Sequence, residues 1–147
     1  MKRTVLILLA VMVLVLIWFQ SVVPERRSDH ESVWFTNEVI NPLLAKLGYG
    51  AVSSIIVRKA AHVSEFFVLS FISLFVWKGR FVPSVYTGFT AAFLDESVQL
   101  VANRGALISD VWIDLIGVLS GAAVGWAIWK IASLIKVHMR NARHGEA

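Results

Sequence analysis

Four long apolar runs dominate the pattern of hydrophobic and polar positions along the chain. They cover residues 4–23, 60–77, 81–101 and 110–135, and polar segments separate them. An α-helix rises 1.5 Å per residue, so about 20 apolar residues cross a hydrocarbon core of about 30 Å. The pattern therefore predicts an all-α membrane protein, a bundle of four transmembrane helices.

The first run also has features of a secretory signal peptide. Lys2 and Arg3 precede it, as basic residues do in such peptides. The residues near its end, Trp18, Phe19 and Gln20, do not form a small-residue cleavage site, and bulky aromatic residues are typical of a membrane interface. We interpret the run as a retained span, with a cleaved signal peptide as the alternative.

A weaker helical signal lies between the first two runs. Residues 24–29 are polar and are expected to form a loop outside the lipid. Between residues 32 and 47, apolar residues recur mostly at three- and four-residue steps, as on one face of a helix: Val33, Trp34, Val39, Ile40, Leu43, Leu44 and Leu47. We predict a short amphipathic helix in the first outer loop, which Pro42 kinks or splits. It either caps the bundle, the interpretation we favour, or forms a lid over a polar site.

The composition agrees with a membrane protein of one domain, residues 1–147. Apolar residues make up 57% of the chain and charged residues 16%, whereas soluble domains have roughly 45–50% and 25%. The chain has no cysteine, which excludes a disulfide framework and thiolate chemistry. The net charge of +4 comes from Lys and Arg beside the apolar runs, where such residues set topology or contact anionic headgroups. Membrane lipids rather than nucleic acid are the expected partners, and the oligomeric state stays open.

The distribution of Lys and Arg predicts that both termini are cytoplasmic. In that orientation the cytoplasmic side carries Lys2, Arg3, Lys78, Arg80, Lys130, Lys136, Arg140 and Arg143. The outer side carries Arg26, Arg27, Lys46, Arg58, Lys59 and Arg104. Because basic residues are more frequent on the cytoplasmic side, this excess favours a multi-pass membrane protein in that orientation.

Charged side chains at the ends of the apolar runs would then meet on the outer face. A charge near the centre of a membrane helix costs at least about 2.5–3.5 kcal/mol, so such residues normally mark a site. His62 and Glu65 share one face of a helix, as do Asp110 and Asp114. The candidate catalytic residues are His62, Glu65, Asp95, Glu96, Asp110 and Asp114, and the candidate binding residues are Arg58, Lys59, Gln99 and Arg104.

These residues permit several kinds of chemistry. Imidazole and carboxylates can act as general acids and bases, or hold Mg, Mn, Zn or Ca, so a divalent metal is a candidate cofactor that the sequence does not establish. Basic residues beside them could bind a phosphate-bearing headgroup. The alternative is a salt-bridge scaffold, in which Arg58, Lys59 and Arg104 neutralise the acids. Hydrogen bonds between membrane helices contribute only about 0.6 kcal/mol each, so we favour a site.

A stripe of glycines continues the face of the fourth run that carries Asp114. Gly117, Gly121 and Gly125 recur every four residues, and such spacing lets helix backbones approach closely in lipid. The carboxylates at the outer end of this helix should therefore point into the bundle.

Three polar blocks resemble the VanZ-like family of small bacterial membrane proteins. They are Lys59-x-x-His62-x-x-Glu65-Phe66, then Asp95-Glu96-x-x-Gln99 with Arg104, then Ser109-Asp110-x-x-x-Asp114-x-x-Gly117. The resemblance covers roughly residues 58–125 in order and spacing. Gln20-Ser21, with Ser28 and Ser32, is similar to the serine-bearing first loop of the family. Asp114 stands where the family often has Asn, and Val-Ala-Asn precedes Arg104 in place of a Pro-containing turn.

The resemblance implies a protein of the cell envelope. The family's namesake is associated with low-level resistance to teicoplanin, and most members have no assigned activity. The first interpretation is an outward-facing polar site that binds a lipid-linked headgroup or wall precursor. The alternative is an integral membrane hydrolase or transferase acting on a phospholipid or polyprenyl-phosphate headgroup. A small transporter is a third, weaker interpretation, because four helices are few for one.

Overall fold

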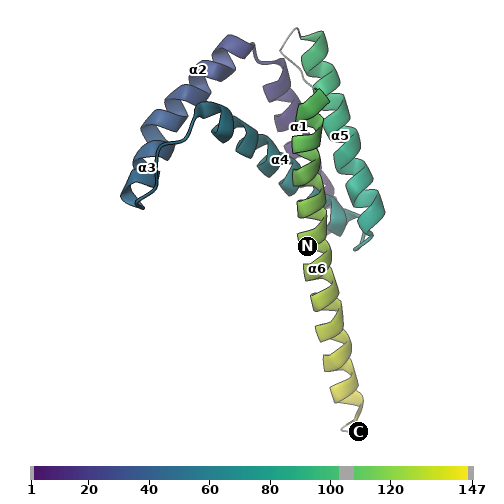
Figure 1. Ribbon diagram of the computed structural model, residues 1–147. Coiled ribbons are helices and arrows are strands. Elements are labelled where there is room, and N and C mark those ends of the chain that lie inside the picture. Colours follow the sequence, from purple (N-terminus) through teal and green to yellow (C-terminus); the bar gives the residue numbers. More distant parts are fainter. Residues whose placement is uncertain (1, 103–107, 146–147) are drawn as a thin grey trace.

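The computed structural model describes residues 2–102 and 108–145, and every regular element in that part of the chain is helical (Figure 1). The elements are α1 (Arg3–Val22), α2 (Glu25–Phe35), the π-helical stretch η1 (Thr36–Ile40), α3 (Asn41–Lys46), α4 (Ser54–Val76), α5 (Phe81–Val101) and α6 (Ile108–Gly145). The expected all-α class is confirmed for the described residues.

Four of these helices, α1, α4, α5 and α6, pack together as a bundle. The most extensive contact is between α4 and α6, while α5 packs on α1, α4 and α6. Figure 1 shows that α2 and α3 form an arm extending away from the bundle, and that the C-terminal part of α6 extends beyond the other helices. The arm contacts the bundle where α2 lies against α4.

Within the described residues, three helical segments are long and apolar enough to cross a membrane: Arg3–Val22, Ser54–Val76 and Asp110–Asn141. The predicted third run does form a helix, α5, but this helix is not among the three. The C-terminal part of α5 carries Asp95, Glu96 and Gln99, which lower its hydropathy. The structure thus supports three apolar spanning helices, with α5 packed against all of them.

Several boundaries differ from those that the sequence predicts; α6, for example, continues to Gly145, beyond the predicted end at residue 135. Residues 24–29 were expected to form a loop, but α2 begins at Glu25, directly after Pro24. The prediction was wrong because polarity excludes this segment from lipid without excluding a helix, and the Arg27–Glu31 pair at 2.9 Å supports a helical turn. Likewise, α4 begins at Ser54, so the charged residues before the apolar run lie within the helix.

The segment predicted as an amphipathic helix is helical but divided. Between α2 and α3 the backbone forms the π-helical stretch η1, immediately before Pro42 in the first turn of α3. A proline inside a helix removes a hydrogen bond and crowds the preceding turn, which a π-helical segment can accommodate. Trp34 and Leu43 of the arm are exposed, at 59% and 53%.

A core of mostly small and branched side chains fills the centre of the bundle: Ile17, Phe66, Leu69, Ala91, Ala92 and Val118. Below the polar end, α4 and α6 come into backbone contact. A Cβ added to Gly117 would lie 2.3 Å from the Val63 carbonyl oxygen, and one added to Gly121 would lie 2.1 Å from the Phe67 oxygen. Both helices therefore run in the same direction with a fixed register, and only glycine fits at these two contacts.

Substitution of Gly121 by Leu should destabilise the protein, because overpacking at a backbone contact costs about 1–3 kcal/mol, or roughly 5–10 °C in melting temperature. The matched control is Ala127→Leu, at an exposed position of the same helix. Thermal unfolding of the detergent-purified chain, followed by tryptophan fluorescence, measures both variants. Equal melting temperatures for the two would contradict the importance of the glycine contact.

Candidate functional site

Three helices bring His62, Asp95 and Asp114 together, and we call these three residues the polar centre. They come from α4, α5 and α6, and one nitrogen or oxygen atom from each lies within 4.8 Å of the others. Asp95 and Asp114 are buried, at 0% and 3% exposed, while His62 is half-buried. The register that the α4–α6 contact imposes places His62 and Asp114 at the same level of the bundle.

A fourth helix joins the polar centre through Ser21 near the end of α1. The Ser21 hydroxyl, itself 1% exposed, donates a hydrogen bond to Oδ1 of Asp95. Gln99, one turn along α5, donates from Nε2 to Oδ2 of Asp95 at 2.7 Å. Both oxygens of this buried carboxylate are therefore held in fixed directions, which is how a functional carboxylate is oriented before a ligand arrives.

Two further acids lie next to the polar centre. Glu65, one turn after His62 on α4, accepts a hydrogen bond at 2.9 Å from the Gln20 amide of α1. Glu96 is buried at 5% exposed, adjacent to Asp95 on α5. Burying ionisable groups this closely in an apolar bundle opposes folding unless they bind something or are neutralised.

The basic candidate residues lie at the rim of this cluster. Arg58 pairs with Asp29 of α2, and Nζ of Lys59 lies 3.5 Å from Oδ1 of Asp110. The Lys59 and Asp110 side chains are 48% and 37% exposed, and pairs of this kind contribute about 0–1 kcal/mol. A salt-bridge scaffold built on these pairs would stabilise the bundle little. Arg104 lies outside the described residues.

A polar pocket of about 240 Å³ opens beside the polar centre, between α1, α2 and α4. It is lined by Gln20, Ser28, Glu31, Ser32, Phe35, Val57, Arg58, Ala61, His62 and Glu65. His62 belongs both to the pocket wall and to the polar centre, so it connects the two. Arg58 and His62, one turn apart on α4, both line this pocket, so a molecule bound there could contact the guanidinium and the imidazole.

The polar centre has the ligand types and spacing for one divalent metal ion. Imidazole nitrogen with carboxylate oxygens suits Zn, Mn and related ions. Metal–oxygen bonds are about 2.0–2.5 Å long, so ligand atoms on opposite sides of an ion lie about 4–5 Å apart. A mutual distance within 4.8 Å satisfies that limit with small movements of the side chains.

The sequence candidates therefore separate into a buried and a peripheral group. His62, Asp95 and Asp114 converge, whereas Asp110 faces Lys59 at the rim. Sequence reasoning did not place Ser21 in the site, nor did it foresee Asp29 as the partner of Arg58. Two features of the sequence could have indicated these roles: the hydroxyl of Ser21 at the polar end of the first apolar run, and the charged residues that follow this run.

Comparison with known proteins matches most of the chain to one family model. The family model VanZ/LLP1 matches residues 5–133, a range that includes α1, the arm, α4, α5 and most of α6. The comparisons with curated proteins and with solved structures found no match.

Proposed function

The chain belongs to the VanZ/LLP1 family, and we propose that its polar centre and the adjoining pocket bind the phosphate-bearing headgroup of a membrane lipid or lipid-linked wall precursor. The observation that carries the proposal is the convergence of His62, Asp95 and Asp114 from three helices beside a pocket that contains Arg58. Buried acids add little stability to a scaffold, whereas a binding site requires polar groups that are held in fixed positions.

The chemistry of the pocket favours a phosphate group. The guanidinium of Arg58 presents a planar fork of donors that matches phosphate oxygens. In the structure, Arg58 forms an exposed ion pair with Asp29. Because such pairs add little stability, a phosphate could replace Asp29 as the partner of Arg58 at a small cost in free energy. A volume of about 240 Å³ equals that of roughly eight water molecules, which suits a headgroup rather than a whole lipid.

The proposed topology is a four-span protein of the bacterial cell membrane with both termini in the cytoplasm. The packing of α5 between α1, α4 and α6 supports its inclusion as the fourth span, because its polar outer end lies at the polar centre rather than against lipid. In this orientation the arm lies at the outer interface. Exposed Trp34 and Leu43 would enter the headgroup layer there, as in amphipathic interfacial helices.

The resemblance to the VanZ-like family suggests a cellular context for this site. Resistance to teicoplanin concerns wall precursors on the outer side of the membrane, and the proposed orientation places the pocket on that side. Binding of a precursor headgroup there would change the exposure of that precursor to the antibiotic.

Neutral variants of the polar centre should lose function while they stay folded. Asp95→Asn, Asp114→Asn and His62→Gln each remove a charged or ligand group, and we expect at least a tenfold loss of headgroup affinity, about 1.4 kcal/mol. The functional readout is teicoplanin susceptibility in cells that depend on this protein, and membrane abundance with thermal stability is measured in parallel. Glu38→Gln is the control, because this acid is exposed and is not among the residues that line the pocket.

Each outcome of that experiment is informative. Variants that remain abundant but no longer protect support a binding site. Variants that disappear from the membrane favour a scaffold, because breaking a buried pair costs about 3–5 kcal/mol. If all three remain folded and fully protective, the proposal is wrong.

The second candidate function is a metal-dependent hydrolase or transferase acting on the same kind of headgroup. The observation that favours it is the metal-like spacing of the polar centre. A bound divalent ion would supply a polarised phosphoryl oxygen and an activated water. His62, Asp95 and Asp114 would hold this ion, and Glu65 and Glu96, on the same helices as His62 and Asp95, would be the candidate groups for proton transfer.

Metal binding can be measured on the purified full chain. We expect about one equivalent of Zn²⁺ or Mn²⁺ by isothermal titration, with affinity reduced at least tenfold by His62→Ala and by Asp95→Asn. Asp110→Asn is the matched control, since this acid faces Lys59 at the rim. Absence of stoichiometric binding, or equal losses in all three variants, would exclude this candidate and leave the headgroup proposal intact.

A further inference from the structure

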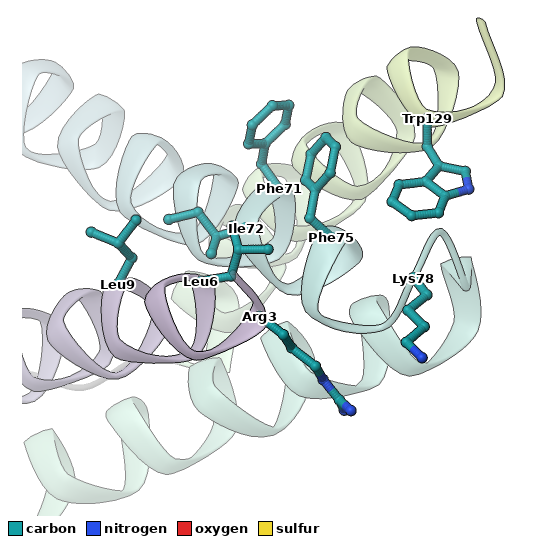
Figure 2. Close-up of a pocket in the computed structure, with 8 residues that line it drawn as sticks. All are labelled: Arg3, Leu6, Leu9, Phe71, Ile72, Phe75, Lys78 and Trp129. Atoms are coloured by element: carbon teal, nitrogen blue, oxygen red, sulfur yellow. The ribbon is translucent and has the colours of Figure 1, made fainter. Parts of the chain in front are cut away.

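A second cavity lies at the opposite end of the bundle from the polar centre. It has a volume of about 520 Å³ and is lined by Arg3, Leu6 and Leu9 of α1, Phe71, Ile72 and Phe75 of α4, Lys78 of the following turn, and Trp129 of α6 (Figure 2). Eighteen residues separate Arg3 from Ser21 on α1, a distance of about 27 Å along the helix. The cavity and the polar centre are thus roughly one hydrocarbon thickness apart.

The apolar wall of this groove is held in place by ring contacts. The ring centroids of Phe71 and Phe75 lie 5.2 Å apart, and those of Phe75 and Trp129 lie 5.9 Å apart in an edge-on arrangement. Gly79, at φ +79°, packs under the indole so closely that a Cβ there would lie 2.3 Å from Trp129. The groove is therefore preformed, which lowers the cost of accommodating a flexible chain.

Two cations stand at the edge of this apolar wall. Figure 2 shows the charged ends of Arg3 and Lys78 pointing to the same side of the groove. Lys78 has φ +55°, a left-handed conformation that costs a residue with a side chain about 1–2 kcal/mol. Glycine would avoid this cost, so the lysine is kept here at the expense of some stability. The eight residues that line the groove include these two cations and no acid.

We propose that this groove binds one anionic phospholipid of the adjoining leaflet, with an acyl chain along Phe71, Phe75 and Ile72 and the phosphate between Arg3 and Lys78. The charge pattern selects the lipid class, because the lining offers cations for a phosphate and no carboxylate for the ammonium of a zwitterionic headgroup. A second copy of the chain is a poorer occupant, because the hydrophobic effect does not drive helix association within lipid. The cations at the edge of the groove would also repel the same cations of a second copy. The site is independent of the headgroup site at the polar centre.

Native mass spectrometry of the detergent-purified full chain tests this proposal, with phosphatidylglycerol and phosphatidylcholine of identical chains offered in equal amounts. We expect one tightly retained phosphatidylglycerol, and a loss of the preference of about tenfold when Arg3→Gln is combined with Lys78→Asn. Asn removes the charge while tolerating the left-handed backbone. The matched control, Lys136→Gln with Arg140→Gln, removes two exposed charges from α6 outside the groove and should leave the preference unchanged.

A third variant separates the apolar wall from the charges. Leu6→Trp adds bulk at the groove and should prevent retention even though both cations remain. Melting temperatures of all variants show whether each is folded. As a second readout, bromine-labelled phosphatidylglycerol bound in the groove should quench the fluorescence of Trp129, and Trp129→Phe should abolish this quenching. Equal effects of the groove and control pairs, undiminished retention in Leu6→Trp, or a groove-dependent dimer without bound lipid would each overturn the proposal.

Discussion

The backbone contact between α4 and α6 is the interaction on which the rest of the structure depends. Gly117 and Gly121 allow the two helices to touch, and this contact fixes their relative register. Toward one end, the register brings Asp114 to the level of His62 and so assembles the polar centre. Toward the other end, it brings the ring of Trp129 onto the aromatic wall of the groove. A larger side chain at either glycine would separate the helices and disturb both places.

The two ends of this contact have opposite physical character. At the end that carries the polar centre, buried carboxylates oppose folding, and the hydrogen bonds to Asp95 recover only part of that cost. Farther along, close-packed residues such as Phe66 and Val118 supply the stabilisation. Functional groups that weaken a fold are tolerated where neighbouring packing compensates. This division explains why the acids gather at one end, beside a pocket, instead of being spread along the helices.

Much of the helical framework could be predicted from the sequence, because apolar length is a strong signal: the predicted run 81–101 coincides with α5, and the family resemblance was confirmed. The start of α4 was missed because Arg58 and the residue after it interrupt the apolar run but not the helix. The contact of Ser21 with Asp95 joins positions 74 residues apart, which periodicity cannot foresee. The groove at the other end had no signal, since groove-lining apolar residues and lipid-facing ones look alike in sequence.

The proposed headgroup site requires that water reach the polar centre from the outer side of the membrane. The chain has no cysteine, so single cysteines can be placed at Ala61, which lines the pocket beside the polar centre, and at Asn141 near the C-terminus. The control is a cysteine at exposed Val68, which the proposed topology places against lipid. In intact cells, a membrane-impermeant thiol reagent should label the cysteine at position 61, whereas the one at 141 should react only after permeabilisation and the one at 68 in neither state. Labelling at 141 but not at 61 in intact cells would contradict the account.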